Sequence, residues 1–406
     1  MEKIIMHIDF DSYFASCEQQ FNPDFRGKAI GVTAEHGRTC IIAASREAKK
    51  FGIKTGSRSY EAQKIIPDII LVPASFDKYY AVTKKFLKIC SFYSPAVELF
   101  SIDEAFIDLT PVMHLYPSIE FVASGIKKRI NKDIGEFITV SIGVSHNRLL
   151  AKLASSINKP NGFATIKKED VDGIYSKIKL TDICGIGEAL RLRLNIIGVF
   201  NFFDLRTCPI NLLKAEFGKV TAYHLKSISL GIDNMPVIPY YIEKDSKSVG
   251  RNYCLPKNEY NQTKILKIIY ELCEEIAKKL RKIDKKAKTI GLCLAGGKSK
   301  CERKTIGKYT DLGQEIFYTC KYLYNQWQWN SMVRRISVWA GNLTHSGYAS
   351  FDFYNDEKKE KIAEVIDSIN EKFGDHTIRN GFLIYTDKLT TKPNGYLSEK
   401  HMPLLI

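Results

Sequence analysis

Two groups of acidic residues lie in apolar, strand-like stretches of the sequence, where an unpaired charge is costly. Asp9 stands in the run IIMHIDF, Asp11 follows two residues later, and the adjacent pair Asp103 and Glu104 stands in LFSIDEAFIDL. Side chains alternate along a strand, so Asp9 and Asp11 should face the same way, whereas Asp103 and Glu104 diverge unless a sharp turn brings both to one rim. Because such carboxylates are rarely unpaired and hard oxygen ligands suit Mg²⁺, the pattern predicts a divalent-metal site.

Each acidic group also has a simpler interpretation. Asp9 would cap the helix that follows it, and Asp103 would pair with a lysine, as acidic residues commonly do. These interpretations are favoured for either group taken alone. The joint appearance of both groups, together with three cations elsewhere in the chain, favours the metal site.

The three cations are basic residues at the ends of expected helices. Arg46 and Lys49 lie on the helix expected over 45–51, and Lys159 ends the helix expected over 147–157. Each by itself would be an ordinary solvated side chain. Beside metal-binding acids they predict a triphosphate clamp, in which the cations hold the β- and γ-phosphates and the metals hold the α-phosphate.

The composition is that of a basic, globular chain. Its 406 residues carry 60 Lys and Arg against 45 Asp and Glu, a net charge of +15, which fits a polyanionic partner such as nucleic acid or an anionic membrane surface. The N-terminus lacks the pattern of a signal peptide, and no apolar run is long enough to span a bilayer, so no membrane partner is expected. Ten cysteines stand singly, without a Cys-x-x-Cys pair, which predicts reduced thiols, a cytoplasmic location and no structural zinc.

The order of the expected elements predicts a multidomain α+β chain. Strands and helices mix over the first 170 residues, as in an α+β sheet domain. Short helices broken by glycine follow over 174–231, and Pro236 and Pro239 mark an extended linker over 235–243. Apolar residues recur at helical spacing over 263–283, and 243–343 should form a second, small α/β domain. Strands are expected at 4–10, 29–33, 39–44, 137–144, 289–294 and 335–339, a strand–turn–strand at 100–109, and the remaining helices at 12–20 and 362–373.

Three sequence blocks, in this order and at this spacing, carry a resemblance. They are Asp9-Phe10-Asp11-Ser12-Tyr13-Phe14, Ser101-Ile102-Asp103-Glu104-Ala105, and Ser141-Ile142-Gly143-Val144-Ser145 continuing through Lys152 to Lys159-Pro160-Asn161-Gly162. Over about residues 4 to 343 the chain closely resembles the Y-family DNA polymerases, and more narrowly their UmuC-like ImpB/MucB/SamB members from Gram-positive bacteria and mobile elements.

The resemblance implies the fold of a polymerase right hand: a palm with a mixed sheet, small fingers, a helical thumb and an added α/β little finger. The implied boundaries are palm 1–20 and 78–170, fingers 21–77, thumb with a helix-hairpin-helix 171–232, linker 233–243, little finger 244–343 and a C-terminal tail 344–406.

The family's activity would be low-fidelity, template-directed DNA synthesis across damaged template, as part of DNA repair and the mutagenic SOS response. A nucleotidyl group would pass from dNTP to the 3′-hydroxyl of primer-template DNA, with release of pyrophosphate, on two Mg²⁺ ions for which Mn²⁺ can substitute. By the resemblance, Asp9 and Asp103 bind both ions and Glu104 binds the catalytic one. The Phe10 carbonyl would be a further ligand.

The resemblance also assigns residues around the incoming nucleotide. Phe14 matches the family's steric gate, a ring that would clash with a 2′-hydroxyl, and Tyr13 stands beside it; core packing is the alternative for both rings. The remaining nucleotide-binding residues implied are Ala43, Ser45, Arg46, Lys49 and Lys159. Many relatives carry Thr at the position of Ala43 and Tyr at that of Arg46, so a phosphate contact from Arg46 would depart from the family pattern.

Two segments are expected to contact duplex DNA without reading its sequence. The glycines of Gly185-Ile186-Gly187 would let backbone N–H groups approach phosphates in a helix-hairpin-helix, although such a turn alone could be an ordinary helix connection. A lysine-rich run over 278–308, which could otherwise be a solvated face, matches the little finger that holds the duplex backbone. The DNA contacts implied there are Arg251, Lys298, Lys300, Arg303 and Lys304.

The C-terminal tail carries a candidate docking peptide. Ser350-Phe351-Asp352-Phe353-Tyr354 stands where related chains carry a peptide for the sliding clamp, with a serine in place of the glutamine. The segment 401–405 is a second candidate, and either segment could instead cover a surface groove. An accessory mutagenesis subunit is a further partner that such a chain can use.

Two other functions would employ some of the same residues. A nucleotide cyclase or another palm-type nucleotidyltransferase shares the two-metal chemistry, but it needs neither the hairpin at 185–187 nor the lysine-rich run. A catalytically idle DNA-binding repair adaptor would be free to lose Asp9, Asp103 and Glu104, which are intact. Template-directed DNA synthesis is therefore the preferred hypothesis.

Overall fold

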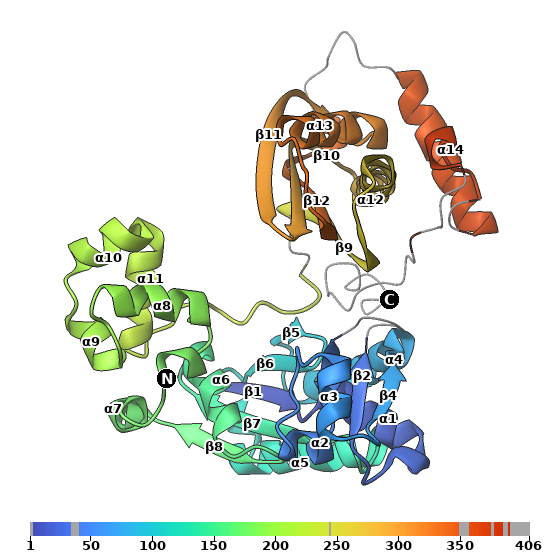
Figure 1. The fold of residues 1–406 in the computed structure, drawn as a ribbon. Coiled ribbons are helices and arrows are strands. Elements are labelled where there is room, and N and C mark those ends of the chain that lie inside the picture. Colours follow the sequence, from blue (N-terminus) through green and yellow to red (C-terminus); the bar gives the residue numbers. More distant parts are fainter. Residues whose placement is uncertain are drawn as a thin grey trace. The chain divides into compact units, whose positions relative to one another are not determined.

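The computed structural model describes residues 3–33, 40–242, 245–348, 357–374, 377–384 and 389. They form two compact units, which divide between residues 243 and 244 and have separate hydrophobic cores (Figure 1). Both units combine helices with sheets, which confirms the multidomain α+β class expected from the sequence. Among the described residues, no helix has both the length and the apolar character needed to cross a membrane.

A five-stranded sheet forms the centre of the first unit. Its order is β5-β6-β1-β7-β8, with β8 parallel to β7 and the other neighbours antiparallel. Met6, Ile8 and Phe10 of β1 point into the main core, where α4 and α5 pack, while Ile5 and His7 point to the opposite face, against α6. The strands are β1 (Ile5–Phe10), β5 (Val97–Ser101), β6 (Glu104–Asp108), β7 (Val140–Ser145) and β8 (Phe163–Ile166), and the helices around them are α1 (Tyr13–Phe21), α4 (Phe76–Tyr93), α5 (Ile119–Asp133) and α6 (Arg148–Ile157).

Helix α6 lies directly on the sheet because of its N-cap and of a glycine beneath it. The Asn147 side chain accepts a hydrogen bond from the Leu150 N–H at 2.9 Å and so begins the helix. A Cβ on Gly143 would lie 2.2 Å from the Ala151 carbonyl oxygen, so only glycine lets the α6 backbone approach β7 this closely. The approach brings two polar α6 residues, Lys152 and Ser155, over the middle of the sheet.

A smaller, three-stranded sheet follows α1 in the first unit. Its order is β3-β2-β4, with β4 parallel to β2, and its strands are β2 (Ile30–Thr33), β3 (Ile41–Ala44) and β4 (Ile70–Pro73). Helices α2 (Arg46–Lys50) and α3 (Ser59–Ile65) close a separate core there. The sequence pattern predicts β2, β3 and α2 but misses β4, whose four residues are too few to show alternation.

Five further short helices belong to the described part of the first unit: α7 (Val171–Tyr175), α8 (Glu188–Ile196), α9 (Phe202–Thr207), α10 (Ile210–Phe217) and α11 (Lys219–Ser229). Gly185 precedes α8 with φ +104°, a left-handed conformation that favours glycine. After α11 the chain is extended, and its Tyr240 N–H donates to the Val97 carbonyl of β5 at 2.8 Å. Short 3₁₀ helices occur at Pro23–Phe25, Met113–Leu115, Lys168–Asp170, Leu180–Asp182, Ser346–Tyr348 and Gly381–Leu383.

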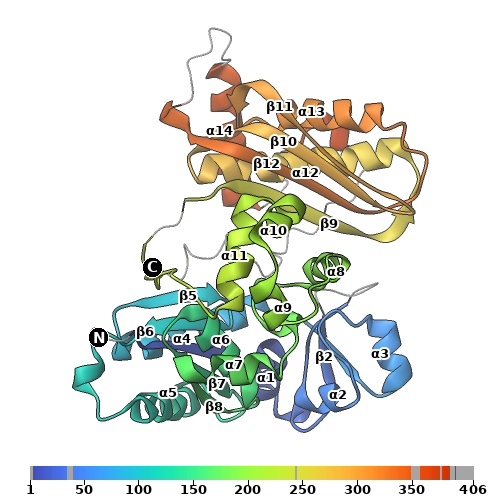
Figure 2. The ribbon, with the colours of Figure 1, turned by 90° about the vertical axis from the view of Figure 1, so that its left-hand side faces the viewer.

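The second unit is an antiparallel sheet with helices packed on one face. The order is β11-β10-β12-β9, and Figure 2 shows the four long strands side by side. The strands are β9 (Ser248–Glu259), β10 (Lys285–Gly296), β11 (Ser299–Thr310) and β12 (Val333–His345), and the helices packed on the sheet are α12 (Gln262–Lys282) and α13 (Gly313–Gln326). A third helix, α14 (Glu357–Phe373), forms the ion pairs Arg281–Asp367 and Lys286–Glu360 with the rest of the unit.

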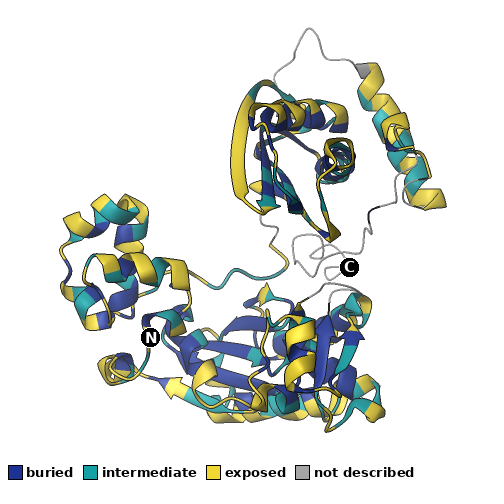
Figure 3. Cartoon of the chain, in the orientation of Figure 1, coloured by how far each residue is buried: buried dark blue, intermediate teal, exposed yellow. Residues whose placement is uncertain are grey.

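The sequence predicts α12 and parts of β10 and β12 but misses β9, β11 and α13. Strand β11 lies at the edge of the sheet and is exposed along most of its length, as Figure 3 shows. Its polar residues therefore lack the alternation of apolar and polar positions that marks a half-buried strand. Strand β9, at the other edge, is also largely exposed.

One expectation about the cysteines needs correction. Cys293 and Cys301 form a disulfide between β10 and β11, whereas the spacing in the sequence predicts ten reduced thiols. The two cysteines stand opposite each other in the register of these strands, so tertiary pairing brings them together although they share no recognised motif.

Candidate active site

Strand register brings the predicted acidic residues to one end of the central sheet. Asp9 on β1 stands opposite Glu104 on β6, and the Phe10 N–H donates to the Asp103 carbonyl at 3.0 Å. Asp103 itself stands in the tight turn between β5 and β6. The sharp turn that the sequence requires therefore exists, and it places Asp103 and Glu104 beside Asp9.

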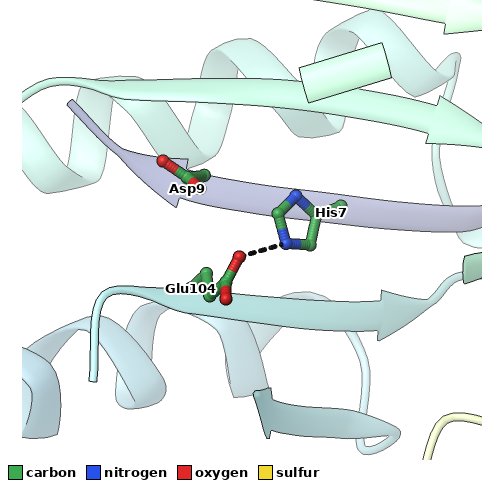
Figure 4. Close-up of side chains that lie close together, drawn as sticks. All are labelled: His7, Asp9 and Glu104. Atoms are coloured by element: carbon green, nitrogen blue, oxygen red, sulfur yellow. Dashed lines mark hydrogen bonds and ion pairs between the residues drawn. The ribbon is translucent and has the colours of Figure 1, made fainter. Parts of the chain in front are cut away.

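The side chains of this region lie close enough to share an ion. One ligand atom from each of His7, Asp9 and Glu104 lies within 4.8 Å of the other two, and Figure 4 shows the three side chains on the facing strands. The Asp103 carboxylate accepts a hydrogen bond from the Ser101 hydroxyl, and its negative charge contributes to raising the pKa of Asp9.

Burial controls the ionisation of these carboxyls. It raises the pKa of Asp9, against the opposing charge of Lys159, and it raises the pKa of Asp103, against the hydrogen bond from Ser101. Burial acts in the same direction on Glu104, but the hydrogen bond from His7 and the charge of Lys152 hold its pKa at about 2. Two half-buried carboxyls whose charge is disfavoured, beside a third that is ionised, are a donor set that a divalent cation would neutralise.

Two lysines already supply part of that positive charge. Lys159 donates to the Asp9 carboxylate, and Lys152 on α6 donates to Glu104 Oε2. Lys159 was predicted to contact nucleotide, and here it lies at the acidic cluster. Lys152 lies within one of the three sequence blocks but had no predicted role.

Asp11 ties the loop after α6 to the sheet. Its buried carboxylate accepts hydrogen bonds from the Thr139 hydroxyl at 2.6 Å, the Ser141 hydroxyl at 2.8 Å and the Asn161 N–H at 2.7 Å. Asn161 is two residues from Lys159, so Asp11 fixes the loop that carries this lysine. Asp11 therefore serves as a structural anchor beside the acidic cluster.

Arg46 and Lys49 approach the same place from α2. Arg46 Nη2 donates to the Thr139 hydroxyl and lies 3.9 Å from Asp11 Oδ2. Burial lowers the pKa of Lys49, and the nearby charge of Lys159 adds to the effect. The structure thus brings together all three predicted cations at one side of the acidic cluster.

The other predicted nucleotide residues divide into buried and partly open positions. Tyr13 is buried and donates to the Tyr79 carbonyl at 2.6 Å, which fits the core alternative for this ring. Phe14 is half-buried and stacks on the Tyr79 ring at 4.5 Å between centroids. Ala43 is buried, and Ser45 is the N-cap of α2, whose side chain accepts from the Ala48 N–H at 3.3 Å.

The predicted DNA-binding residues of the second unit face different ways. Strand register points Arg251 toward the helices, where it forms an ion pair with Glu275 at 2.6 Å. Lys300 and Lys304 point the same way and lie over the rings of Trp327 and Tyr322 respectively. Arg303 alternates with them and is exposed on the opposite, open face of the sheet, while Lys298 donates to Asn330 at the turn.

The remaining predicted residues have simpler positions. In the first unit, Ile186 is buried between Gly185 and Gly187, and Gly187 is the N-cap of α8. The peptide Ser350-Phe351-Asp352-Phe353-Tyr354 and the segment 401–405 lie outside the described residues.

His7 also belongs to the site, although the sequence did not predict it. This residue is fully buried, and its ring nitrogens lie 3.0 Å from Glu104 Oε2 and 2.8 Å from Ser155 Oγ. A signal was present, because a histidine interrupts the apolar run IIMHIDF two residues before Asp9 and therefore on the same face of the strand.

Comparisons with known proteins agree with this arrangement. Residues 8–156 match the model of the impB/mucB/samB family, and residues 246–353 match the model of the impB/mucB/samB family C-terminal domain. The chain is 30% identical to a DNA polymerase IV of Pelotomaculum thermopropionicum over 403 residues, covering 98% of this chain and 97% of that protein. It is 28% identical to a DNA polymerase IV of Acetivibrio thermocellus over 394 residues, covering 95% of this chain and 98% of that protein.

Among solved structures, the Y-family DNA polymerase chimera Dbh-Dpo4(243-245)-Dbh is similar to this chain. The TM-score is 0.71 at 26% sequence identity, and the match covers 84% of this chain and 99% of that one. The similarity extends through both compact units, since it spans far more residues than either unit contains.

Proposed function

We propose that Asp9, Asp103 and Glu104 hold the two Mg²⁺ ions with which this protein extends DNA. The chain belongs to the impB/mucB/samB family of Y-family DNA polymerases. The chain is a DNA-directed DNA polymerase of the translesion kind, and it acts on primer-template DNA and dNTP. Mn²⁺ is proposed as a substitute ion, since it accepts the same oxygen ligands.

The observation that carries this proposal is the position of Asp9 opposite Glu104, with Asp103 in the adjoining turn. These oxygens come from segments more than ninety residues apart in the sequence and meet in a half-buried environment that disfavours their charge. A pair of divalent ions, when bound, would lower the pKa of the primer 3′-hydroxyl and neutralise the departing pyrophosphate.

The residues of the chain have distinct tasks in the proposed reaction. The Phe10 carbonyl adds an oxygen next to Asp9 and Asp103. Lys159, which donates to the Asp9 carboxylate, would bind the phosphates of the nucleotide when bound ions neutralise Asp9, and Lys49 and Arg46 would bind the same phosphates from α2.

Sugar selection falls to Phe14. Its ring rests on Tyr79 and meets Phe76 edge-on at 5.8 Å, so it cannot move away from a 2′-hydroxyl without breaking these contacts. Tyr13 supports it from the core rather than touching nucleotide, and Ala43 and Ser45 shape the strand and helix that carry the cations.

Duplex DNA is proposed to contact backbone N–H groups at Gly185-Ile186-Gly187 and the open sheet face that carries Arg303. Lys298 is at the adjoining turn, whereas Lys300, Lys304 and Arg251 help to hold the helices against the sheet. A sliding clamp bound through 350–354 and an accessory mutagenesis subunit remain proposals from sequence. The proposed compartment is the cytoplasm, where bacterial template DNA lies.

Primer extension with Mg²⁺ and dNTP on undamaged and abasic templates tests the assignment. We expect Asp103→Ala to abolish extension while binding of primer-template DNA survives, because only the ion site is removed. Asp68→Ala, at an exposed position, is the matched control and should extend normally. Extension that persists in Asp103→Ala would refute the site, and DNA binding without any extension by the wild-type chain would instead favour a repair adaptor.

A further inference from the structure

His7 is a buried polar residue at the acidic cluster with a hydrogen bond from each side of its ring. Its Nε2 lies 3.0 Å from Glu104 Oε2, and its Nδ1 lies 2.8 Å from Ser155 Oγ on α6 (Figure 4). The ring also packs against Phe106 at 4.5 Å between centroids. Contacts with β6 and α6 therefore fix both the position and the tilt of the ring.

The hydrogen-bonding groups determine the direction of these bonds. An ionised carboxylate only accepts, so Nε2 carries a proton and donates to Glu104 Oε2. Nδ1 lies 2.8 Å from the Ser155 hydroxyl, which also donates to the Lys152 carbonyl at 2.8 Å. Both ring nitrogens are thus engaged by Glu104 and Ser155, although His7 lies within reach of the carboxylate oxygens.

The bond from His7 selects one oxygen of Glu104. Both His7 and Lys152 donate to Oε2, and Oε1 has no hydrogen bond among the described residues. Lys152 is partly exposed and positively charged, so an arriving cation repels it. His7 is fully buried and its ring is held by Ser155 and Phe106, so it can keep its hydrogen bond to Oε2 in both states.

We propose that His7 is a positioning residue that, anchored by Ser155, orients Glu104 so that Oε1 faces the divalent ion. This inference rests on the proposed function, because it assumes that Glu104 is a ligand. A freely rotating glutamate would lose conformational entropy when it binds an ion, and His7 removes that loss in advance.

The test uses the full-length protein and Mn²⁺ alone, with free Mn²⁺ measured by electron paramagnetic resonance. His7→Leu removes the donor at similar volume, His7→Gln keeps an N–H donor, and His114→Leu is a matched change at an exposed histidine. We expect His7→Leu to raise the Kd for Mn²⁺ roughly 10- to 100-fold, the usual effect of losing an outer hydrogen bond to a ligand. His7→Gln should recover much of the affinity, and His114→Leu should match the wild type.

Extension assays at increasing Mn²⁺ separate positioning from a purely structural role. If His7 only positions Glu104, high Mn²⁺ restores most of kcat in His7→Leu, whereas a damaged fold gives no such recovery. Unchanged Mn²⁺ affinity in a folded His7→Leu protein would overturn the inference. If this variant does not fold, Ser155→Ala replaces it, with weaker Mn²⁺ binding supporting the inference and unchanged binding overturning it.

Variants of the ligands themselves distinguish a failure of the His7 role from a failure of the proposed ion site. If Asp9→Asn and Asp103→Asn weaken Mn²⁺ binding but His7→Leu does not, only the role of His7 fails. If none of the three variants changes Mn²⁺ affinity, the proposed ion site fails as well.

Discussion

Replacing Glu104 by glutamine should lower the stability of the metal-free first unit in a pH-dependent way. The folded protein holds the pKa of Glu104 at about 2, against an ordinary value of 4.5, through the hydrogen bond from His7 and the charge of Lys152, which overcome the effect of burial. A carboxyl whose pKa is lowered by folding stabilises the folded state above the ordinary pKa. That contribution disappears as pH falls from about 4.5 to about 2.

The size of the effect follows from the same values. At about 1.4 kcal/mol for each tenfold change in the acid constant, the fall from 4.5 to about 2 corresponds to roughly 3 kcal/mol. Solvent reaches 11% of the Glu104 side chain, so we expect Glu104→Gln to cost about 2 kcal/mol at pH 7. The cost should shrink toward zero near pH 2, where the wild-type carboxylate is protonated too.

Denaturant unfolding in EDTA can measure this change unit by unit. All three tryptophans, Trp327, Trp329 and Trp339, belong to the second unit, so their fluorescence reports on that unit alone, while far-UV circular dichroism reports on both. Glu104→Gln should shift the circular dichroism transition of the first unit and leave the tryptophan transition unchanged. The exposed Glu169→Gln is the control. A loss in Glu104→Gln that is equal at pH 7 and pH 3 would refute the electrostatic reasoning, because it would not depend on the charge.

The other predictions concern sugar selection, DNA binding and the segment after α11. Phe14→Ala should raise ribonucleotide incorporation in primer extension by on the order of ten- to hundredfold, and unchanged sugar selectivity would remove Phe14 as the gate. Arg303→Ala should lower the slope of log affinity against log salt concentration by about 1 in DNA-binding titrations. Lys300→Ala should lower it less, because the Lys300 ammonium lies 3.1 Å from Glu302. Equal slopes would contradict the assignment of Arg303 to the open face and Lys300 to the helix-covered face of the sheet. Arg148→Met breaks a buried ion pair with Glu98 and should lower the free energy of unfolding of the first unit by about 3 kcal/mol. Hydrogen exchange at the Ile238 amide, which also donates to Glu98, should become faster. An unchanged exchange rate would show that the ion pair does not hold the segment after α11.

The roles of the lysines illustrate how far sequence reasoning reaches. Lys300, Lys304 and Arg303 are near neighbours in a basic run, and the sequence treats them alike. In the structure they alternate across β11, so Lys304 covers the Tyr322 ring of α13, Lys300 covers the Trp327 ring just after that helix, and Arg303 faces outward. The period of two in a strand decides this division, and it becomes visible only once the segment is known to be a strand.

Local patterns in the sequence determined the fold class, the strands β1, β5, β6 and β7, the amphipathic helix α12 and the identity of the acidic residues. These features depend on residues close together in the chain, such as an apolar strand interrupted by Asp9 or a helical repeat of apolar side chains. The edge strands β9 and β11 were not predicted, because they bury too little surface to show an alternation of apolar and polar residues.

Tertiary structure alone decided which partner each functional group has. The register of β1 against β6 sets Asp9 opposite Glu104, and the packing of α6 on Gly143 brings Ser155 to His7 and Lys152 to Glu104. The physical reason is that hydrogen bonds and ion pairs act over a few ångströms, whereas these residues lie about fifty to one hundred and fifty positions apart. These residues come into contact only when the sheet is folded.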